Sequence, residues 1–147
     1  MMKLSACAAL VAALFTPILP AGAADKPLYG GVTAVELPMA SPSTDVLGRP
    51  LAYPAGTPVV KAYRITVPPG AATSVHLHEV PLFAYILSGT LEVDYGTKGK
   101  RTYKAGDGFM EAVAWCHRGR AVGDRPAVLV AAYLGNGTLK NAVDCPK

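Results

Sequence analysis

The three histidines of this 147-residue chain lie in two short segments, VHLH at 75–78 and CHR at 116–118. Imidazole is the commonest metal ligand in proteins. In a strand, residues two apart face the same side, so His76 and His78 project together and Leu77 faces away. His117 comes 39 residues after His78, far enough to fold back onto the pair. This pattern predicts a divalent metal site. The alternative is a pair of polar residues on the solvent face of a strand.

The segments around the histidines favour strands throughout. Thr90–Tyr95 alternates cleanly, with apolar residues at every second position and Glu92 and Asp94 between them. Turn signals rich in glycine, proline and aspartate recur about every 8 to 12 residues, and no helical period competes with them. This pattern predicts an all-β fold, a small antiparallel β-barrel or jelly roll. The expected strands are 59–67, 73–78, 82–87, 90–95, 101–104, 109–113, 116–122 and 127–135.

The spacing of glycines and histidines resembles the two motifs of the cupin superfamily, over about residues 59–135. The first motif is matched by Gly70, the His76-Leu77-His78 triplet and Gly89; the second is matched by Gly106-Asp107 and His117. The stretches YILSGTLEVDYG and YKAGDGFMEA strengthen the resemblance. It implies a small antiparallel jelly-roll barrel whose metal ligands lie inside, on the strands of the two motifs.

The chain departs from the cupin pattern at its metal ligands. The glutamate usual in the first motif is Leu82 here, and the proline and glycine of the second are Ala112 and Ala114. Glu111 is the candidate replacement, because a carboxylate among apolar neighbours needs a partner such as a metal or an arginine. Its alternative is an ordinary solvent-facing position. The expected metal set is therefore His76, His78, His117 and Glu111.

Imidazole-rich sites accept Fe, Mn, Ni, Zn or Cu, so the residues leave the divalent metal open. Three functions remain compatible with the sequence. The first is a metal-dependent enzyme, such as an oxygenase acting on a small molecule, because open metal positions suit catalysis. The second is a small-molecule or metal-binding module without turnover. The third is a degenerate cupin that no longer holds metal.

The N-terminal residues predict export. Residues 1–23 have an early lysine, an apolar run and a small-residue ending, which is the pattern of a cleaved signal peptide. An extended arm at 24–58, a cupin barrel at 59–135 and a C-terminal tail at 136–147 follow. Periplasmic or secreted proteins form disulfides, so Cys116 and Cys145 are expected either to pair or to remain two buried thiols.

The remaining composition limits the partners. The formal net charge is only +4, and no long basic run is present, so neither nucleic acid nor a membrane surface is expected after signal cleavage. A small-molecule ligand fits the expected interior site. Exposed strand edges and the extended arm make a homodimer a reasonable expectation.

Overall fold

The computed structural model describes residues 30–39 and 42–146. The chain falls into two units, Met1–Val35 and Glu36–Lys147. Of the first unit, residues 30–35 are described, and they form a turn at 30–31 followed by exposed chain. The predicted signal peptide at 1–23 lies outside the described residues. Every strand named below belongs to the second unit.

The second unit is built from short strands joined by tight turns, as the sequence predicts. Eight strands overlap the expected segments, and the ninth lies in the tail. In chain order the elements are β1 (Val59–Val67), β2 (His76–Leu77), β3 (Leu82–Ser88), β4 (Thr90–Asp94), the 3-10 turn η1 (Gly96–Lys98), β5 (Lys100–Lys104), β6 (Gly108–Met110), β7 (Arg118–Ala121), β8 (Ala127–Gly135) and β9 (Val143–Asp144).

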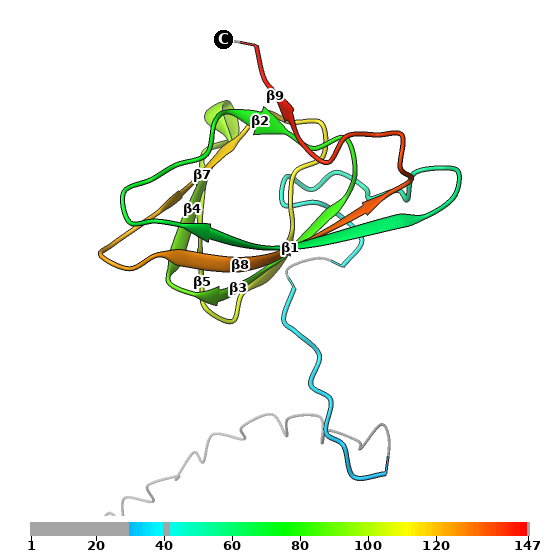
Figure 1. The fold of residues 1–147 in the computed structure, drawn as a ribbon, viewed down its shortest axis with the longest axis horizontal. Helices are drawn as coiled ribbons and strands as arrows, with labels where there is room; N and C mark the ends of the chain where they lie inside the picture. Colours follow the sequence, from blue (N-terminus) through cyan, green and yellow to red (C-terminus); the bar gives the residue numbers. More distant parts are fainter. Residues whose placement is uncertain (1–29, 40–41, 147) are drawn as a thin grey trace, which may run out of the picture. The chain divides into compact units, whose positions relative to one another are not determined.

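Two antiparallel sheets form the layers of the unit. One sheet has the order β1-β8-β3-β6 and the other the order β5-β4-β7, while β2 and β9 pair with each other (Figure 1). The longest pairing joins all nine residues of β1 to β8, from Val59 opposite Gly135 to Val67 opposite Ala127. The all-β, jelly-roll prediction is therefore confirmed.

Closure into a barrel, which we also predicted, is wrong for the described residues. Between β1 and β2 the chain contacts β7 through isolated bridges at Pro69 and Ala72 and through hydrogen bonds between Thr73 and Gly119, rather than through a continuous ladder. Pro68 and Pro69 cause this, because a proline has no backbone N–H to donate to a ladder. The result is a sandwich with an open seam beside β2.

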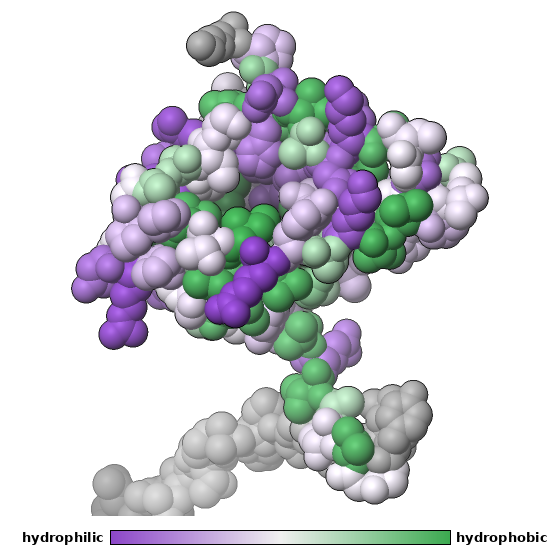
Figure 2. All heavy atoms as spheres, viewed as in Figure 1, coloured by the Kyte–Doolittle hydropathy of each residue, from purple (hydrophilic) through white to green (hydrophobic). Residues whose placement is uncertain are grey.

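The core lies between the two sheets and follows from the alternation of residues along each strand. In β4, Leu91 and Val93 are buried while Glu92 and Asp94 are only partly covered. Ile86 from β3 and Leu129 from β8 meet them from the opposite sheet. Outside the core, the face in Figure 2 mixes hydrophilic and hydrophobic residues. Among the described residues, no helix is long and apolar enough to span a membrane.

A disulfide joins Cys116, just before β7, to Cys145, just after β9. The two Cα atoms are 6.1 Å apart, within the usual range for a disulfide. This finding confirms the predicted pairing and replaces the alternative of two free thiols. The bond closes a loop of 29 residues and attaches the C-terminal tail to the strand that carries His117.

Gly89 offers a sharp test of the turn between β3 and β4. Its φ is +75°, and a Cβ there would lie 2.2 Å from the Pro126 carbonyl oxygen. We expect Gly89→Ala to cost about 3 kcal/mol in the free energy of unfolding, from backbone strain plus the clash. Gly70→Ala is the matched control, since φ is +73° with open space around it, and should cost about 1 kcal/mol. Equal costs in urea unfolding would contradict this account.

Candidate metal centre

Backbone pairing brings the two histidine segments together. His76 and His117 form an antiparallel bridge, in which the His117 N–H donates to the His76 carbonyl at 2.8 Å and the reverse bond is 2.9 Å. Residue 78 is held separately, because the Ala114 N–H donates to the His78 carbonyl at 2.7 Å. Main-chain hydrogen bonds thus fix the backbone of all three histidines.

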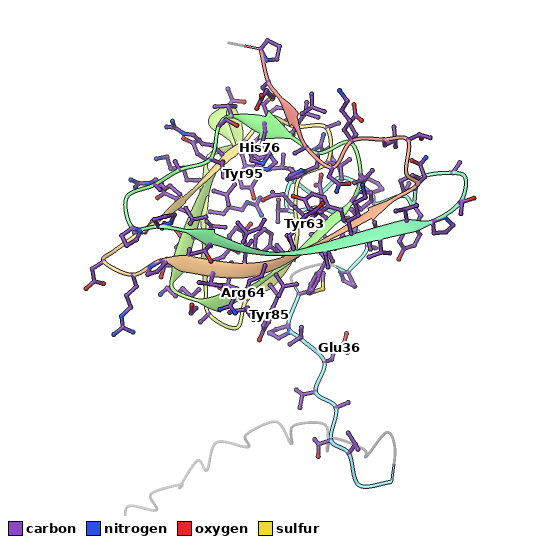
Figure 3. The ribbon with its side chains drawn as sticks, viewed as in Figure 1. Glu36, Tyr63, Arg64, His76, Tyr85 and Tyr95 are labelled. Carbon is purple, nitrogen blue, oxygen red and sulfur yellow. A yellow bond between two sulfur atoms is a disulfide. The ribbon has the colours of Figure 1, made fainter. Side chains whose placement is uncertain are left out.

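The three imidazole rings meet at one point inside the sandwich. Ring centroids are 5.0 Å apart for His76 and His78, 4.7 Å for His76 and His117, and 5.0 Å for His78 and His117. One nitrogen from each ring lies within 4.8 Å of the others. His78 and His117 are almost fully buried and His76 is half-buried, at the β2 end of the sandwich where Figure 3 labels it.

Each ring is oriented by a backbone carbonyl on its Nδ1 atom. His76 Nδ1 lies 2.9 Å from the Ser74 oxygen, His117 Nδ1 2.8 Å from the Trp115 oxygen, and His78 Nδ1 2.6 Å from the Asn141 oxygen. A carbonyl only accepts, so each Nδ1 carries the proton and each Nε2 keeps its lone pair. Metal-bound histidines are held in this way, so the three residues fit a divalent metal.

Burial keeps the ligand nitrogens free of protons. Removal from water lowers the pKa of His78 to about 4, and it also lowers the pKa of His117 from its ordinary value. Neutral imidazole is the form that binds a metal ion. Near neutral pH these two rings therefore need to lose no proton before a metal binds.

Glu111 lies beside the cluster, directly after β6, and is buried. Its Oε1 atom accepts hydrogen bonds from the Tyr95 hydroxyl and from the Ala112 N–H, both at 2.7 Å. Its Oε2 atom is 3.8 Å from His117 Nε2. Burial raises the pKa of this carboxyl to about 7. One oxygen is thus fixed by two donors while the other lies near His117, and the solvent-facing alternative is wrong. Glu111 is outside the group of ligand atoms that lie within 4.8 Å of one another, which only the three histidines form among the described residues.

Tyr95 is the buried donor that holds Glu111. Its side chain is completely covered, and burial raises the pKa of its hydroxyl well above the ordinary value, so the group stays protonated. The Tyr103 hydroxyl lies 3.3 Å beyond it. Tyr95 was not among the predicted site residues, although the alternation of 90–95 places it on the buried face.

A cavity of about 70 Å³ adjoins the cluster, and its walls are largely apolar. Its polar lining groups are Thr73, the three histidines, Glu111 and Tyr133. Tyr133, whose ring centroid is 5.4 Å from that of His78, was not predicted as a site residue. No lysine or arginine is among the described residues that line the cavity. Arg64, on β1, points to the outer side of its sheet (Figure 3).

A loop in the N-terminal arm supports the turn after Glu111. The buried Asp45 carboxylate accepts bonds from the Leu47 and Arg49 N–H groups, from Arg49 Nε, and from the Val113 N–H at 3.2 Å. Arg49 also donates to the Val113 carbonyl. The next residue, Ala114, has a φ of +51°, an unfavourable value for alanine. The Asp45 loop thus holds a strained turn beside His78, a role that no pattern in the arm predicts.

Two residues that neighbour the histidines in sequence lie away from the cavity. Glu79 points outward, and its Oε2 accepts the Lys140 N–H at 2.6 Å. Cys116 is in the disulfide. Leu82, at the position of the usual cupin glutamate, lines the cavity as an apolar wall.

Comparisons with known proteins agree with this architecture. A cupin-like protein from Thermotoga maritima is similar over 60% of this chain and 65% of its own, with a TM-score of 0.54 and 22% identity. The DMSP lyase DddQ from Ruegeria pomeroyi has a TM-score of 0.51 and 24% identity, over 58% of this chain and 42% of its own. An oxalate oxidase has a TM-score of 0.51 and 22% identity, over 59% of this chain and 46% of its own. Identities this low show the fold alone.

The chain spans less than two thirds of the length of these three proteins. A search of curated proteins found no match. Residues 63–133 match the family described as "Cupin domain". With the jelly-roll fold and the three-histidine cluster on its two motifs, this chain is a member of the cupin superfamily.

Proposed function

We propose that this cupin is an exported, metal-dependent oxygenase that acts on a small molecule. The observation that carries the proposal is the convergence of three histidine ring nitrogens beside a cavity, with Glu111 Oε2 3.8 Å from His117 Nε2. Such a metal would bind dioxygen and act as a Lewis acid toward a substrate oxygen. The chain's own residues supply the ligands, the apolar walls and one ionisable group.

Glu111 is the fourth ligand in this proposal. Support comes from the different contacts of its two oxygens. Oε1 accepts hydrogen bonds from Tyr95 and Ala112, while Oε2 lies 3.8 Å from His117 Nε2. A carboxyl group whose pKa is raised to about 7 gains most from a nearby cation, because the cation stabilises its charged form. In this proposal the carboxylate would supply the fourth donor that Leu82 cannot supply.

The donor set favours Fe(II) or Mn(II) among the metals that the sequence left open. One carboxylate and three imidazoles are ligands of the kind that these ions accept, and both ions leave positions for substrate. Zn, Ni and Cu are the alternatives that elemental analysis would reveal.

The cavity limits the substrate. A volume of about 70 Å³ holds only a few heavy atoms, so we propose that the substrate inserts a small, largely apolar portion. Because no lysine or arginine lines the cavity within the described residues, the metal is the positive partner for any anionic group. A second candidate function, a metal-binding module without turnover, is favoured by the same small volume.

Export is supported by the disulfide. A single cysteine pair that is joined across 29 residues is typical of an oxidising compartment, either the periplasm or the outside of the cell. The predicted signal peptide at 1–23 would provide the route. A homodimer remains a proposal that rests on the exposed edge strand β1.

The metal site is tested by its content. We expect the untagged mature protein to retain about one equivalent of a divalent metal, and His76→Ala/His78→Ala to lose it, because two of the three imidazoles are removed. A Lys61→Ala/Lys100→Ala variant, altered at two exposed positions, should keep the metal. Equal, negligible content in wild type and histidine variant would favour the degenerate, metal-free cupin.

Glu111→Gln tests the fourth ligand. The change keeps the size of the side chain but weakens the oxygen donor, so we expect metal affinity to fall about 10-fold or more in a competition against a chromogenic chelator. Glu92→Gln, in a surface ion pair, is the matched control and should leave affinity unchanged. Unchanged affinity in Glu111→Gln would remove this residue from the ligand set.

Oxygen consumption separates the enzyme from the binding module. We expect metal-loaded protein to consume dioxygen with at least one small substrate in a panel of phenols, thiols and dicarbonyls, and His76→Ala/His78→Ala to consume none above background. The measurement is oxygen-electrode uptake, with product analysis. Metal retention without uptake for any substrate would favour the binding module.

A further inference from the structure

The C-terminal segment 137–146, here called the strap, runs along the segment that carries His76 and His78. Its Lys140 N–H donates to Glu79 Oε2, and its Cys145 N–H donates to the Val75 carbonyl at 3.0 Å. Between these points β9 pairs with β2, placing Asp144 opposite His76 and Val143 opposite Leu77. Figure 1 shows β9 lying beside β2 at the top of the view.

The strap supplies the hydrogen-bond acceptor of the His78 ring, whereas the other two histidine rings have acceptors in their own segments. The Nδ1 atoms of His76 and His117 bond to carbonyls two residues earlier in their own segments. His78 Nδ1 instead bonds to the Asn141 carbonyl, 63 residues away in sequence, at 2.6 Å. The orientation and protonation of one metal ligand therefore depend on a segment outside both cupin motifs.

Few non-covalent contacts hold the strap. Its ladder to β2 has only two residue pairs, and its described residues are all exposed or half-buried. A bond from Ser74 Oγ to Asp144 Oδ1, 3.0 Å long, is exposed. Segments with little burial and exposed hydrogen bonds open easily. The covalent attachment is the Cys116–Cys145 disulfide, and Cys116 directly precedes His117.

We propose that the strap is a positioning element of the metal centre, and that the disulfide makes metal affinity depend on the thiol redox state. The bond holds the Asn141 carbonyl over His78 while anchoring to the segment of His117. A dithiol reductant would convert the bond to two thiols, supplying two electrons and two protons as it becomes a disulfide itself. The released strap would leave His78 Nδ1 without its fixed acceptor. This inference rests on the proposed metal-binding function.

The test uses Co(II) as the probe on the mature, metal-stripped protein. We expect Cys116→Ser/Cys145→Ser to bind Co(II) about 10-fold more weakly than the oxidised wild type, the size typical of losing a partner that orients a ligand. Wild type reduced with a dithiol, then freed of reductant without oxygen, should match the variant, and reoxidation should restore the affinity. The Co(II) absorption spectrum should change with the affinity, which a purely structural bond would not cause.

A second variant keeps the disulfide, in case its loss prevents folding. Ser74→Ala/Glu79→Gln removes the Ser74 hydroxyl that bonds Asp144 and weakens the Glu79 acceptor by removing its charge, and it should weaken Co(II) binding a few-fold. Its matched control is Ser88→Ala/Glu92→Gln, which makes the same two changes in β3 and β4 rather than beside the strap. In Zn(II)-loaded, ¹⁵N-histidine-labelled protein, the Nδ1 proton of His78 should exchange faster in the strap variants while those of His76 and His117 stay protected.

The outcomes separate this inference from the proposed function. Wild type that fails to bind Co(II) would overturn both. Wild type that binds Co(II), with both strap variants within twofold of it and an unchanged His78 proton, would overturn the strap inference alone. If the cysteine variant does not fold, the result for Ser74→Ala/Glu79→Gln decides.

Discussion

The site depends on one pair of backbone hydrogen bonds, those between His76 and His117. They join segments that are 41 positions apart and set both imidazoles on the inner side of the sandwich. The bridge is isolated, because the chain between β1 and β2 meets β7 without a continuous ladder. His76 is half-buried there, while His78 and His117 are buried.

Burial makes the cluster costly unless each polar atom has a partner. Three Nδ1 atoms use backbone carbonyls, and Glu111 Oε1 uses Tyr95 and Ala112, so what stays uncommitted is three Nε2 atoms and Oε2. The shifts agree with this pattern: desolvation lowers the pKa of His78 and raises that of Glu111, so both favour their neutral forms. A divalent cation is the ligand that these uncommitted atoms most need.

Local patterns in the sequence predicted the strands and the directions of their side chains, because these depend on neighbouring residues. The alternation at 90–95 and the turn glycines predicted the strands, and the His-x-His spacing placed two rings on one face. Long-range contacts were beyond such reasoning. Asp45 holds Val113 across 68 positions, and Asn141 holds His78 across 63, without any periodicity in the arm or tail that indicates a partner. The unclosed seam was missed because the predicted strand ranges do not indicate which strands pair.

The residues that make this cupin particular therefore lie largely in its flanks. The family match covers 63–133, and the Asp45 loop and the strap lie on either side of it. Each of them acts on His78. The Asp45 loop holds the Val113–Ala114 turn, in which the Ala114 N–H donates to the His78 carbonyl. The strap supplies the Asn141 carbonyl, which accepts a hydrogen bond from the His78 ring. One histidine is thus held from both ends of the chain, whereas its two companions are oriented by their own strands. His78 therefore depends most on distant segments, and it is the residue through which the flanks can change the metal affinity.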